Sequence, residues 1–256
     1  MPEGDSIVHA RDRVSAAIGG KALIRAEVRG RVLRLPRRVT GVESRGKHLL
    51  VRFDDGLTLR THLRMHGRWD TYAPDAPWRK PEYRARAVLV ADDGWSAVCF
   101  DAPEVEMLTG PSHEADRLGR LGPDLCAPEA DLDAAVARLD RIDPATELGV
   151  ALLDQRVMAG VGNVFKSEIC WACELDPFAP VAALDDTARR DVVDTAARLL
   201  RANLGPGRRV TYGRGYAVYG RARWPCPRCG TIVRMRKQGL QRRSTYWCPG
   251  CQRPAR

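Results

Sequence analysis

At 256 residues the chain exceeds the usual size of one domain, so we expect one large or two medium-sized domains. Hydrophobic residues make up 44% and charged residues 29%, which predicts a globular protein and excludes a disordered chain; no apolar run is long enough to span a membrane. The net charge of +10 indicates a polyanionic partner.

The chain begins Met-Pro-Glu-Gly-Asp. One interpretation is that Pro2 only permits removal of Met1, while Gly4 and Asp5 cap a helix; the other is that the exposed terminus is itself a reagent. Apolar residues recur at helical spacing after Asp5 and stop at Gly19-Gly20, which predicts an N-capped helix. The segment lacks the pattern of a signal peptide, so we expect a cytoplasmic protein.

Short runs rich in branched residues follow this helix and predict strands. They are residues 22–28, 48–53, 57–63, 86–91 and 96–100. Asp55-Gly56 and Asp93-Gly94 lie between such runs and are typical of hairpin turns. Residues 1–108 therefore predict one helix followed by a mainly antiparallel β-sandwich or flattened barrel.

Glycines and prolines make residues 109–129 loop-like, and we expect a linker there. Beyond it, helical spacing appears in residues 132–140, 147–155, 163–172 and 187–204. We therefore expect a helical domain over residues 130–215 and a cysteine-containing module over residues 216–256. The chain as a whole is predicted to have an α+β fold.

Two Cys-x2-Cys pairs lie 18 residues apart in this last module. They are Cys226, Cys229, Cys248 and Cys251. Two such pairs present four thiolates to a tetrahedral zinc ion, and two disulfides are the alternative. Because four sulfur ligands leave no open position, the zinc would be structural and would stabilise the β-hairpin expected between the pairs. The remaining cysteines are expected to be buried or idle thiols: Cys99, Cys126, Cys170 and Cys173.

Positive charge is concentrated in the same region. From Arg201 to Arg256 there are 14 lysines and arginines and no acidic residue. A disordered polybasic tail is one interpretation, but the aromatic residues and cysteines of this segment predict a folded module that binds a phosphate backbone. Arg242 and Arg243 lie near the end of the expected hairpin, where we expect a contact with nucleic acid.

A glycine turn precedes one of the expected helices. Gly160 and Gly162 allow a close backbone approach, and Asn163 is placed to cap the helix that follows. Free N–H groups at a helix start bind anions, and in a basic protein the expected anion is a DNA phosphate. Glycines that serve only helix packing are the alternative.

Five motifs occur in one order along the chain: PEGD, ESRGKHLLV, HLRMHGRW, LLDQ…AGVGN and VYGR…PCPRCG…YWCPGC. In this combination the chain resembles the formamidopyrimidine-DNA glycosylase and endonuclease VIII family of base-excision repair. The resemblance implies a helix and β-sandwich, then a helix–two-turn–helix domain with a zinc finger. It also implies a bifunctional DNA glycosylase and abasic-site lyase that acts as a monomer on damaged double-stranded DNA in the bacterial cytoplasm, at the nucleoid. Bubble and single-stranded DNA are further candidate substrates.

The same resemblance makes Pro2, after removal of Met1, the nucleophile that attacks C1′ of the damaged nucleotide. A terminal amine has a pKa of about 7.7–8.0, so a useful fraction is uncharged at neutral pH. The resulting iminium acidifies the sugar and permits β- or β,δ-elimination of the flanking phosphates. Glu3 would manage protons at the sugar. Lys47 would contact the phosphate beside the lesion, although its alternative role is that of an ordinary surface lysine.

Other residues are implied to hold the DNA. Asn163 and Arg243 match phosphate-binding positions of the family, and Lys166, one helical turn further, is a weaker candidate of the same kind. A flipped base leaves a hole in the duplex that a protein side chain must fill. The residues at the matching place are Arg64, Met65 and His66. Met65 is a flexible apolar wedge in this interpretation and a core methionine in the alternative.

The opening PEGD and the lack of an Arg-x-Phe-Gly loop favour the branch that removes oxidised pyrimidines. Only 14 residues separate Leu204 from Tyr219, which is short for the loop that covers 8-oxoguanine. Met65 instead resembles the oxidised-purine branch, which stays an alternative. A non-catalytic protein that binds abasic or damaged DNA is a further alternative. A zinc-ribbon protein unrelated to repair leaves residues 1–108 unexplained.

Overall fold

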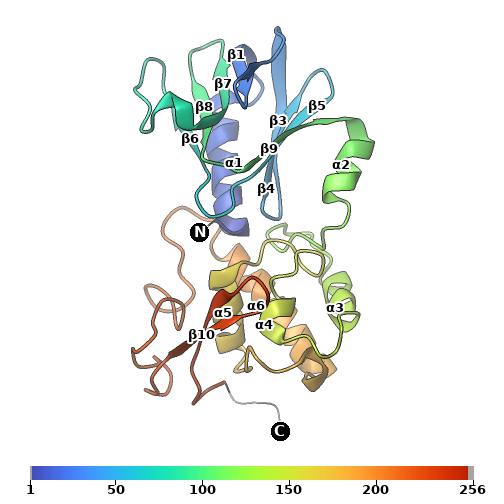
Figure 1. The fold of residues 1–256 in the computed structure, drawn as a ribbon, viewed down its shortest axis with the longest axis vertical. Helices are drawn as coiled ribbons and strands as arrows, with labels where there is room; N and C mark the ends of the chain where they lie inside the picture. Colours follow the sequence, from blue (N-terminus) through green and yellow to red (C-terminus); the bar gives the residue numbers. More distant parts are fainter. Residues whose placement is uncertain (1, 253–256) are drawn as a thin grey trace. The chain divides into compact units, whose positions relative to one another are not determined.

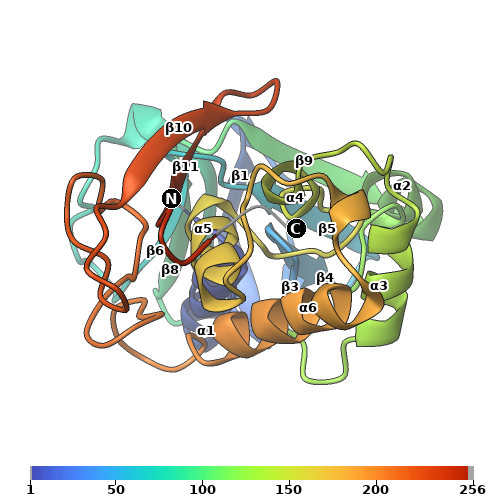
Figure 2. The same ribbon diagram turned by 90° about the horizontal axis from the view of Figure 1, so that it is seen from below.

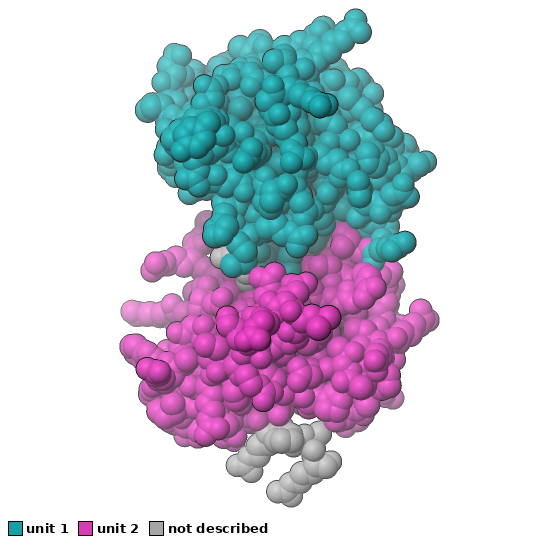
Figure 3. All heavy atoms as spheres, in the orientation of Figure 1, with its two compact units in different colours: residues 1–120 teal, residues 121–256 magenta. Residues whose placement is uncertain are grey.

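The computed structural model describes residues 2–252, so the expected removal of Met1 lies outside the described residues. The chain divides into two compact units, Met1–Arg120 and Leu121–Arg256 (Figure 3). Unit 1 is the β-sandwich with its leading helix, and unit 2 is helical and carries the cysteine hairpin, as the α+β prediction requires. No helix within the described residues is long and apolar enough to cross a membrane.

Unit 1 contains nine strands among its described residues. They are β1 (Ala22–Val28), β2 (Arg31–Val32), β3 (Arg37–Arg45), β4 (His48–Phe53), β5 (Leu57–His62), β6 (Arg68–Tyr72), β7 (Ala85–Ala91), β8 (Ser96–Phe100) and β9 (Glu104–Thr109). The strand order is β6-β8-β7-β1-β3-β4-β5-β9, with β2 paired to β1. Only two residue pairs join β1 to β3, and the sheet divides there into the two layers of the predicted sandwich.

All five predicted strands are present, but the sequence missed β2, β3, β6 and β9. Charged residues interrupt the branched runs in the longer of these strands. Strands β3 and β9 carry arginine or glutamate on their accessible faces, and β6 begins Arg-Trp-Asp. A short 3-10 helix, η1 (Glu82–Arg84), precedes β7.

Helix α1 (Gly4–Ile18) packs its apolar side against both layers of the sandwich (Figure 1). Ile7, Val14 and Ile18 are fully buried there. The helix ends at Gly19, and Gly20 adopts a left-handed φ of 72° that a residue with a side chain rarely accepts. The burial of one whole face explains why this helix is rigidly held against the sheet.

The cap of α1 differs from the prediction. Glu3, and not Asp5, is the N-cap residue, and Gly4 is already helical. Asp5 instead accepts a hydrogen bond from Ser6 N at 2.7 Å within the first turn, while Glu3 N donates to Ser6 Oγ at 3.5 Å. The helix therefore begins at Gly4, and only the N-cap residue Glu3 separates it from Pro2.

The expected loop after unit 1's last strand is wrong over residues 110–118, which form helix α2 (Gly110–Leu118). Proline is compatible with the first turn of a helix, so Pro111 does not prevent it. Leu118 is fully buried, and Glu114 is paired with Arg52 of β4, with Arg52 Nη2 2.9 Å from Glu114 Oε1. These contacts fix the segment to the sheet.

Unit 2 consists of short helices and one hairpin. Its elements are α3 (Leu132–Asp140), α4 (Leu148–Ala151), α5 (Asn163–Ala172), η2 (Val181–Ala183), α6 (Asp186–Arg201), β10 (Arg234–Gln238) and β11 (Arg243–Trp247). The helix expected over residues 147–155 is only one turn long. It stops because the side chains of Asp154 and Gln155 bond backbone groups of a tight turn, Asp154 Oδ1 to Arg156 N and Gln155 Nε2 to Val161 O. Strand β11 packs beside α5 (Figure 2).

Candidate functional site

The start of the chain brings a ring nitrogen and a carboxylate together. Pro2 is half-buried and lies immediately before α1, and Glu3 is fully buried although it is an acidic residue. A buried carboxyl group is costly unless it is bonded or functional, so this position is not that of an ordinary surface glutamate. The first turn of α1 and the turn between β3 and β4 lie at the same end of unit 1 (Figure 1).

That second turn carries Lys47. Gly46 and Lys47 connect Arg45 to His48, which pair across the hairpin, and Gly46 has a left-handed φ of 58°. The lysine is half-buried on a two-residue turn, so its position is fixed by the strands on both sides. Unit 1 thus presents the three expected catalytic residues at one end: Pro2, Glu3 and Lys47.

Two histidines lie directly behind Lys47. His48 and His62 face each other across β4 and β5, with ring centroids 4.8 Å apart. Burial, together with neighbouring cations, lowers the pKa of His48 to about 3. Burial also lowers the pKa of His62 to about 4, against the opposing charge of Glu104. Both rings are therefore neutral at pH 7, and Arg60 Nη1 lies 3.0 Å from Nδ1 of His48.

The turn after β5 exposes the expected wedge residues. They are Arg64, Met65 and His66. Met65 is 49% exposed, which contradicts the alternative of a core methionine. Arg64 has a left-handed φ of 49°; its N–H donates to His62 Nδ1 at 3.3 Å, and its guanidinium pairs with Glu104 at 2.5 Å. His62 therefore bonds the backbone of the wedge turn, and its ring partner His48 adjoins the Lys47 turn.

In unit 2 the glycine turn and the hairpin meet through Asn163. It is the first residue of α5, whose N-cap is Gly162, so it does not cap the helix as predicted. Its Nδ2 donates to Ser244 O at 2.7 Å, next to Arg243, and its buried Oδ1 has no hydrogen-bond partner within the described residues. The two expected phosphate contacts thus lie in one neighbourhood.

Lys166 differs from the expectation. Its side chain is fully buried, with Nζ 2.6 Å from Thr245 Oγ1 and 3.4 Å from Ser244 O. A buried ammonium group in this position does not reach a phosphate in solvent. The structure therefore gives Lys166 a structural role, which is to attach α5 to β11.

Sequence reasoning also missed Glu168 of α5, which is buried as Glu3 is at the head of α1. It is 1% exposed, and its two carboxylate oxygens accept four hydrogen bonds. The donors are Thr211 Oγ1, Ala217 N at 2.8 Å, Val218 N at 2.9 Å and Tyr219 N at 2.8 Å. Glu168 therefore fixes the loop that follows α6. An acidic residue among the apolar residues of NVFKSEICWA was the available signal.

The four cysteines of the two pairs converge as predicted. All four Sγ atoms lie within 4.8 Å of one another, and the closest pairs are 3.3, 3.4 and 3.9 Å apart. Tetrahedral zinc with Zn–S bonds of about 2.3 Å places its sulfurs about 3.8 Å apart, so the donor set fits. All described cysteines are free, which contradicts the disulfide alternative. Trp171 of α5 donates to Cys226 Sγ at 3.4 Å.

The pKa of the Cys229 thiol is lowered to about 6, first by a hydrogen bond from the Thr231 side chain. A thiolate is the form that binds a metal ion. The other cysteines are as expected: Cys99, Cys126 and Cys170 are buried, and burial raises the pKa of Cys170.

Comparison with known proteins gives two matches to family models. Residues 1–105 match the formamidopyrimidine-DNA glycosylase N-terminal domain, and residues 121–212 match the formamidopyrimidine-DNA glycosylase H2TH domain. A probable endonuclease 8 2 from Streptomyces coelicolor is 43% identical, covering 98% of this chain and 94% of that protein. DNA-(apurinic or apyrimidinic site) lyase Nei2 from Mycolicibacterium smegmatis is 39% identical, covering 98% and 99%.

Solved structures match the fold over nearly the whole chain. The Lactococcus lactis formamidopyrimidine-DNA glycosylase in complex with abasic-site DNA has a TM-score of 0.81 at 22% identity, covering 98% of this chain and 100% of that one. At this identity the likeness establishes the fold alone.

We expect Glu168→Gln to loosen the loop that follows α6. The amide has one oxygen and cannot accept all four hydrogen bonds, so buried N–H donors lose their acceptor at a cost of about 1–3 kcal/mol. Urea unfolding and hydrogen exchange at Ala217, Val218 and Tyr219 measure this. The control is Glu174→Gln, whose exposed ion pair with Arg228 is worth little. Equal stability of the two variants would contradict the assignment.

The buried histidines predict a pH dependence of stability in unit 1. An unfolded histidine has a pKa of about 6.5, and the folded values are lower, so the unfolded state binds protons first as the pH falls. The stability that depends on the neutral rings is complete above pH 6.5, decreases as the pH falls below 6.5, and is lost once the pH reaches about 4 for His62 and about 3 for His48. NMR titration of the ring Cε1–H signals of His48 and His62 tests this. Midpoints near 6.5 for both rings would refute it.

Proposed function

Because the chain belongs to the formamidopyrimidine-DNA glycosylase and endonuclease VIII family, we propose that it excises oxidised bases from DNA and then cuts the strand at the abasic site. The observation that carries the proposal is the chain start, where Pro2 is followed by the fully buried Glu3 at the head of α1. A DNA-binding protein without chemistry has no need of a free terminal amine, although Glu3 also takes part in the capping box of α1.

In the proposed reaction, the amine nitrogen of Pro2 bonds to C1′ of the damaged nucleotide as the bond from C1′ to the base breaks. The base leaves with the electron pair of that bond and takes up the proton that the Pro2 nitrogen loses. Glu3 then supplies a proton to O4′, the bond from C1′ to O4′ breaks, and the nitrogen lone pair forms the iminium. The iminium acidifies the C2′ proton, so its removal expels the 3′ phosphate, and a second elimination expels the 5′ phosphate.

The remaining residues have supporting roles in this proposal. Lys47 binds the phosphate beside the lesion, and Met65 fills the space that the flipped base leaves. Asn163 and Arg243 bind backbone phosphates. His48 follows Lys47 and His62 precedes the turn of Met65, and the two neutral rings contact each other across β4 and β5.

We propose oxidised pyrimidines as the preferred lesions. The support is the likeness to relatives named endonuclease 8 and Nei2, and the short loop before Tyr219, which Glu168 holds. Oxidised purines are the alternative, and the exposed Met65 favours them. The same proposal includes strand cleavage by β- and δ-elimination. It also includes bubble and single-stranded DNA as further substrates.

We further propose that the four cysteines bind one structural zinc ion, whose chemistry is to crosslink the hairpin and the segment before it. We also propose a catalytic domain over residues 1–108, a linker over 109–129, a helical DNA-binding domain over 130–215 and a zinc finger over 216–256. The same proposal includes a monomeric state and a place in the bacterial cytoplasm at the nucleoid, since the named relatives are bacterial.

The test is borohydride trapping on a panel of duplexes with an oxidised pyrimidine, an oxidised purine or an abasic site. Protein whose N-terminal mass shows that Met1 is removed should form a covalent adduct and cut the strand. Glu3→Gln should lower the excision rate by about 10²–10⁴-fold while DNA affinity changes little, because it removes proton transfer only. Absence of any adduct from correctly processed protein would leave the non-catalytic DNA-binding alternative.

Metal removal tests the zinc assignment. A strong chelator should release one zinc ion per chain and abolish binding to abasic DNA, because the hairpin loses its crosslink, whereas unit 1 should stay folded by circular dichroism. Cys248→Ser should reproduce the effect. Cys173→Ser, which lies outside the cluster, should retain the metal and the binding. Full DNA binding by metal-free protein would exclude the structural role.

A further inference from the structure

The tip of the β10–β11 hairpin exposes a leucine. Leu240 has a relative exposure of 105%, the highest among the large hydrophobic side chains of the described residues. The tip residues 239–242 form a tight turn, in which Gly239 and Arg242 have left-handed φ values of 65° and 48°. Single exposed apolar side chains are common, so this exposure needs a second observation before it carries a function.

The second observation is the rigid attachment of the tip. At the base of the tip, Gln238 is buried; its Nε2 donates to Pro177 O at 2.7 Å and Glu147 Oε2 at 2.9 Å, and its Oε1 accepts from Thr245 at 2.7 Å. A Cβ atom on Gly149 would collide with the same Gln238 side chain. The Gln238 side chain therefore packs directly against the backbone of α4. Leu240 is therefore carried on a fixed base.

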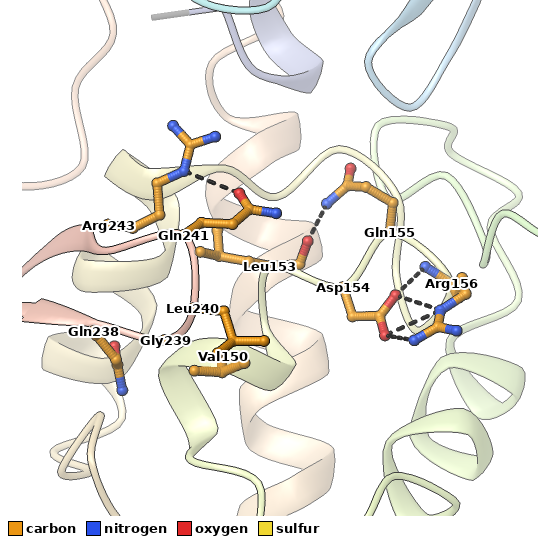
Figure 4. Close-up of a pocket in the computed structure, with 10 residues that line it drawn as sticks. All are labelled: Val150, Leu153, Asp154, Gln155, Arg156, Gln238, Gly239, Leu240, Gln241 and Arg243. Carbon is orange, nitrogen blue, oxygen red and sulfur yellow. Dashed lines mark hydrogen bonds and ion pairs between the residues drawn. The ribbon is translucent and has the colours of Figure 1, made fainter.

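A pocket of 480 Å³ lies under the tip, between the hairpin and the chain around α4 (Figure 4). Apolar residues Val150 and Leu153 line it together with Leu240. The leucine lines the rim of this pocket and yet stays solvent-exposed, so intramolecular packing does not satisfy it. Arg243 stands beside the pocket, with its Nε 3.2 Å from Gln241 Oε1 (Figure 4).

The third observation is the charge around the leucine. The hairpin carries five cations, Arg234, Arg236, Lys237, Arg242 and Arg243, and no acidic residue. Asp154 of the facing segment also lines the pocket. A ligand that suits an apolar tip followed by Arg242 and Arg243 has anionic edges and an apolar floor. The DNA minor groove has this character, since phosphates border a groove about 6 Å wide whose walls are deoxyribose rings. A partner protein would need a larger apolar surface than one leucine.

We propose that Leu240 enters the minor groove of the bound DNA and packs against its sugars, while the flanking arginines bind the phosphates on both sides. Proteins are known to insert leucine between base steps from the minor groove, so this groove accepts the side chain. The inference rests on the proposed DNA-binding function and deepens it. It adds an apolar contact, independent of salt, to the expected phosphate contact of Arg243.

The test compares Leu240→Gln with Leu240→Met on a duplex containing a stable abasic-site analogue, with affinity measured across a range of salt concentrations. Leu240→Gln should weaken binding about tenfold at every salt concentration, because it removes apolar burial and no charge. Leu240→Met should bind like the unchanged protein. Arg243→Ala should reduce the slope of log K against log salt by about one. Thermal unfolding of Leu240→Gln should be unchanged, since the side chain is exposed.

A second measurement locates the contact. With 2-aminopurine at successive positions of the duplex, Leu240→Gln should alter the fluorescence change at one or two neighbouring positions only. Unchanged affinity and fluorescence in Leu240→Gln, with binding by the unchanged protein intact, would overturn this inference and leave the proposed function standing. Failure of the unchanged protein to bind the duplex would overturn both.

Discussion

The buried polar contacts of helix α5 are the interaction on which unit 2 depends. Asn163 and Lys166 bond the hairpin strand β11, Glu168 bonds the loop after α6, and Trp171 bonds the sulfur of Cys226. A buried charge is tolerated only when its partners are complete, so each contact requires the others to stay in place. One helix of ten residues therefore sets the relative positions of the hairpin, the loop and the metal ligands.

Unit 1 also contains buried polar side chains, but these are neutral. His48 and His62 lie among three cations and one glutamate, and burial keeps both rings uncharged. A neutral ring nitrogen can accept a hydrogen bond, which is what the backbone of Arg64 requires for its left-handed conformation. The pair thus adjoins two turns that are 17 residues apart in sequence, at Lys47 and Arg64, and bonds the second of them.

Much of the fold follows from local sequence signals. Cysteine spacing predicted the cluster of four cysteines, branched runs predicted five strands, and helical spacing predicted α1, α3, α5 and α6. The errors share a physical cause. The cap at Glu3, the helix at 110–118 and the inward position of Lys166 each depend on tertiary partners that no local pattern contains. Glu168 stood out only as a charge on an apolar helix, which does not reveal the backbone amides that it binds.

Gly149 shows how far such dependence extends. It touches neither the cysteines nor any residue expected to meet DNA, but the hairpin approaches its Cα so closely that a methyl group would push Gln238 away. The buried amide of Gln238, which precedes the tip with Leu240 and Arg243, is thus accommodated by the absence of a side chain on α4. A random screen for lost DNA repair would therefore recover substitutions at Gly149 that look remote from every functional group, and the defect would be one of aim rather than of chemistry.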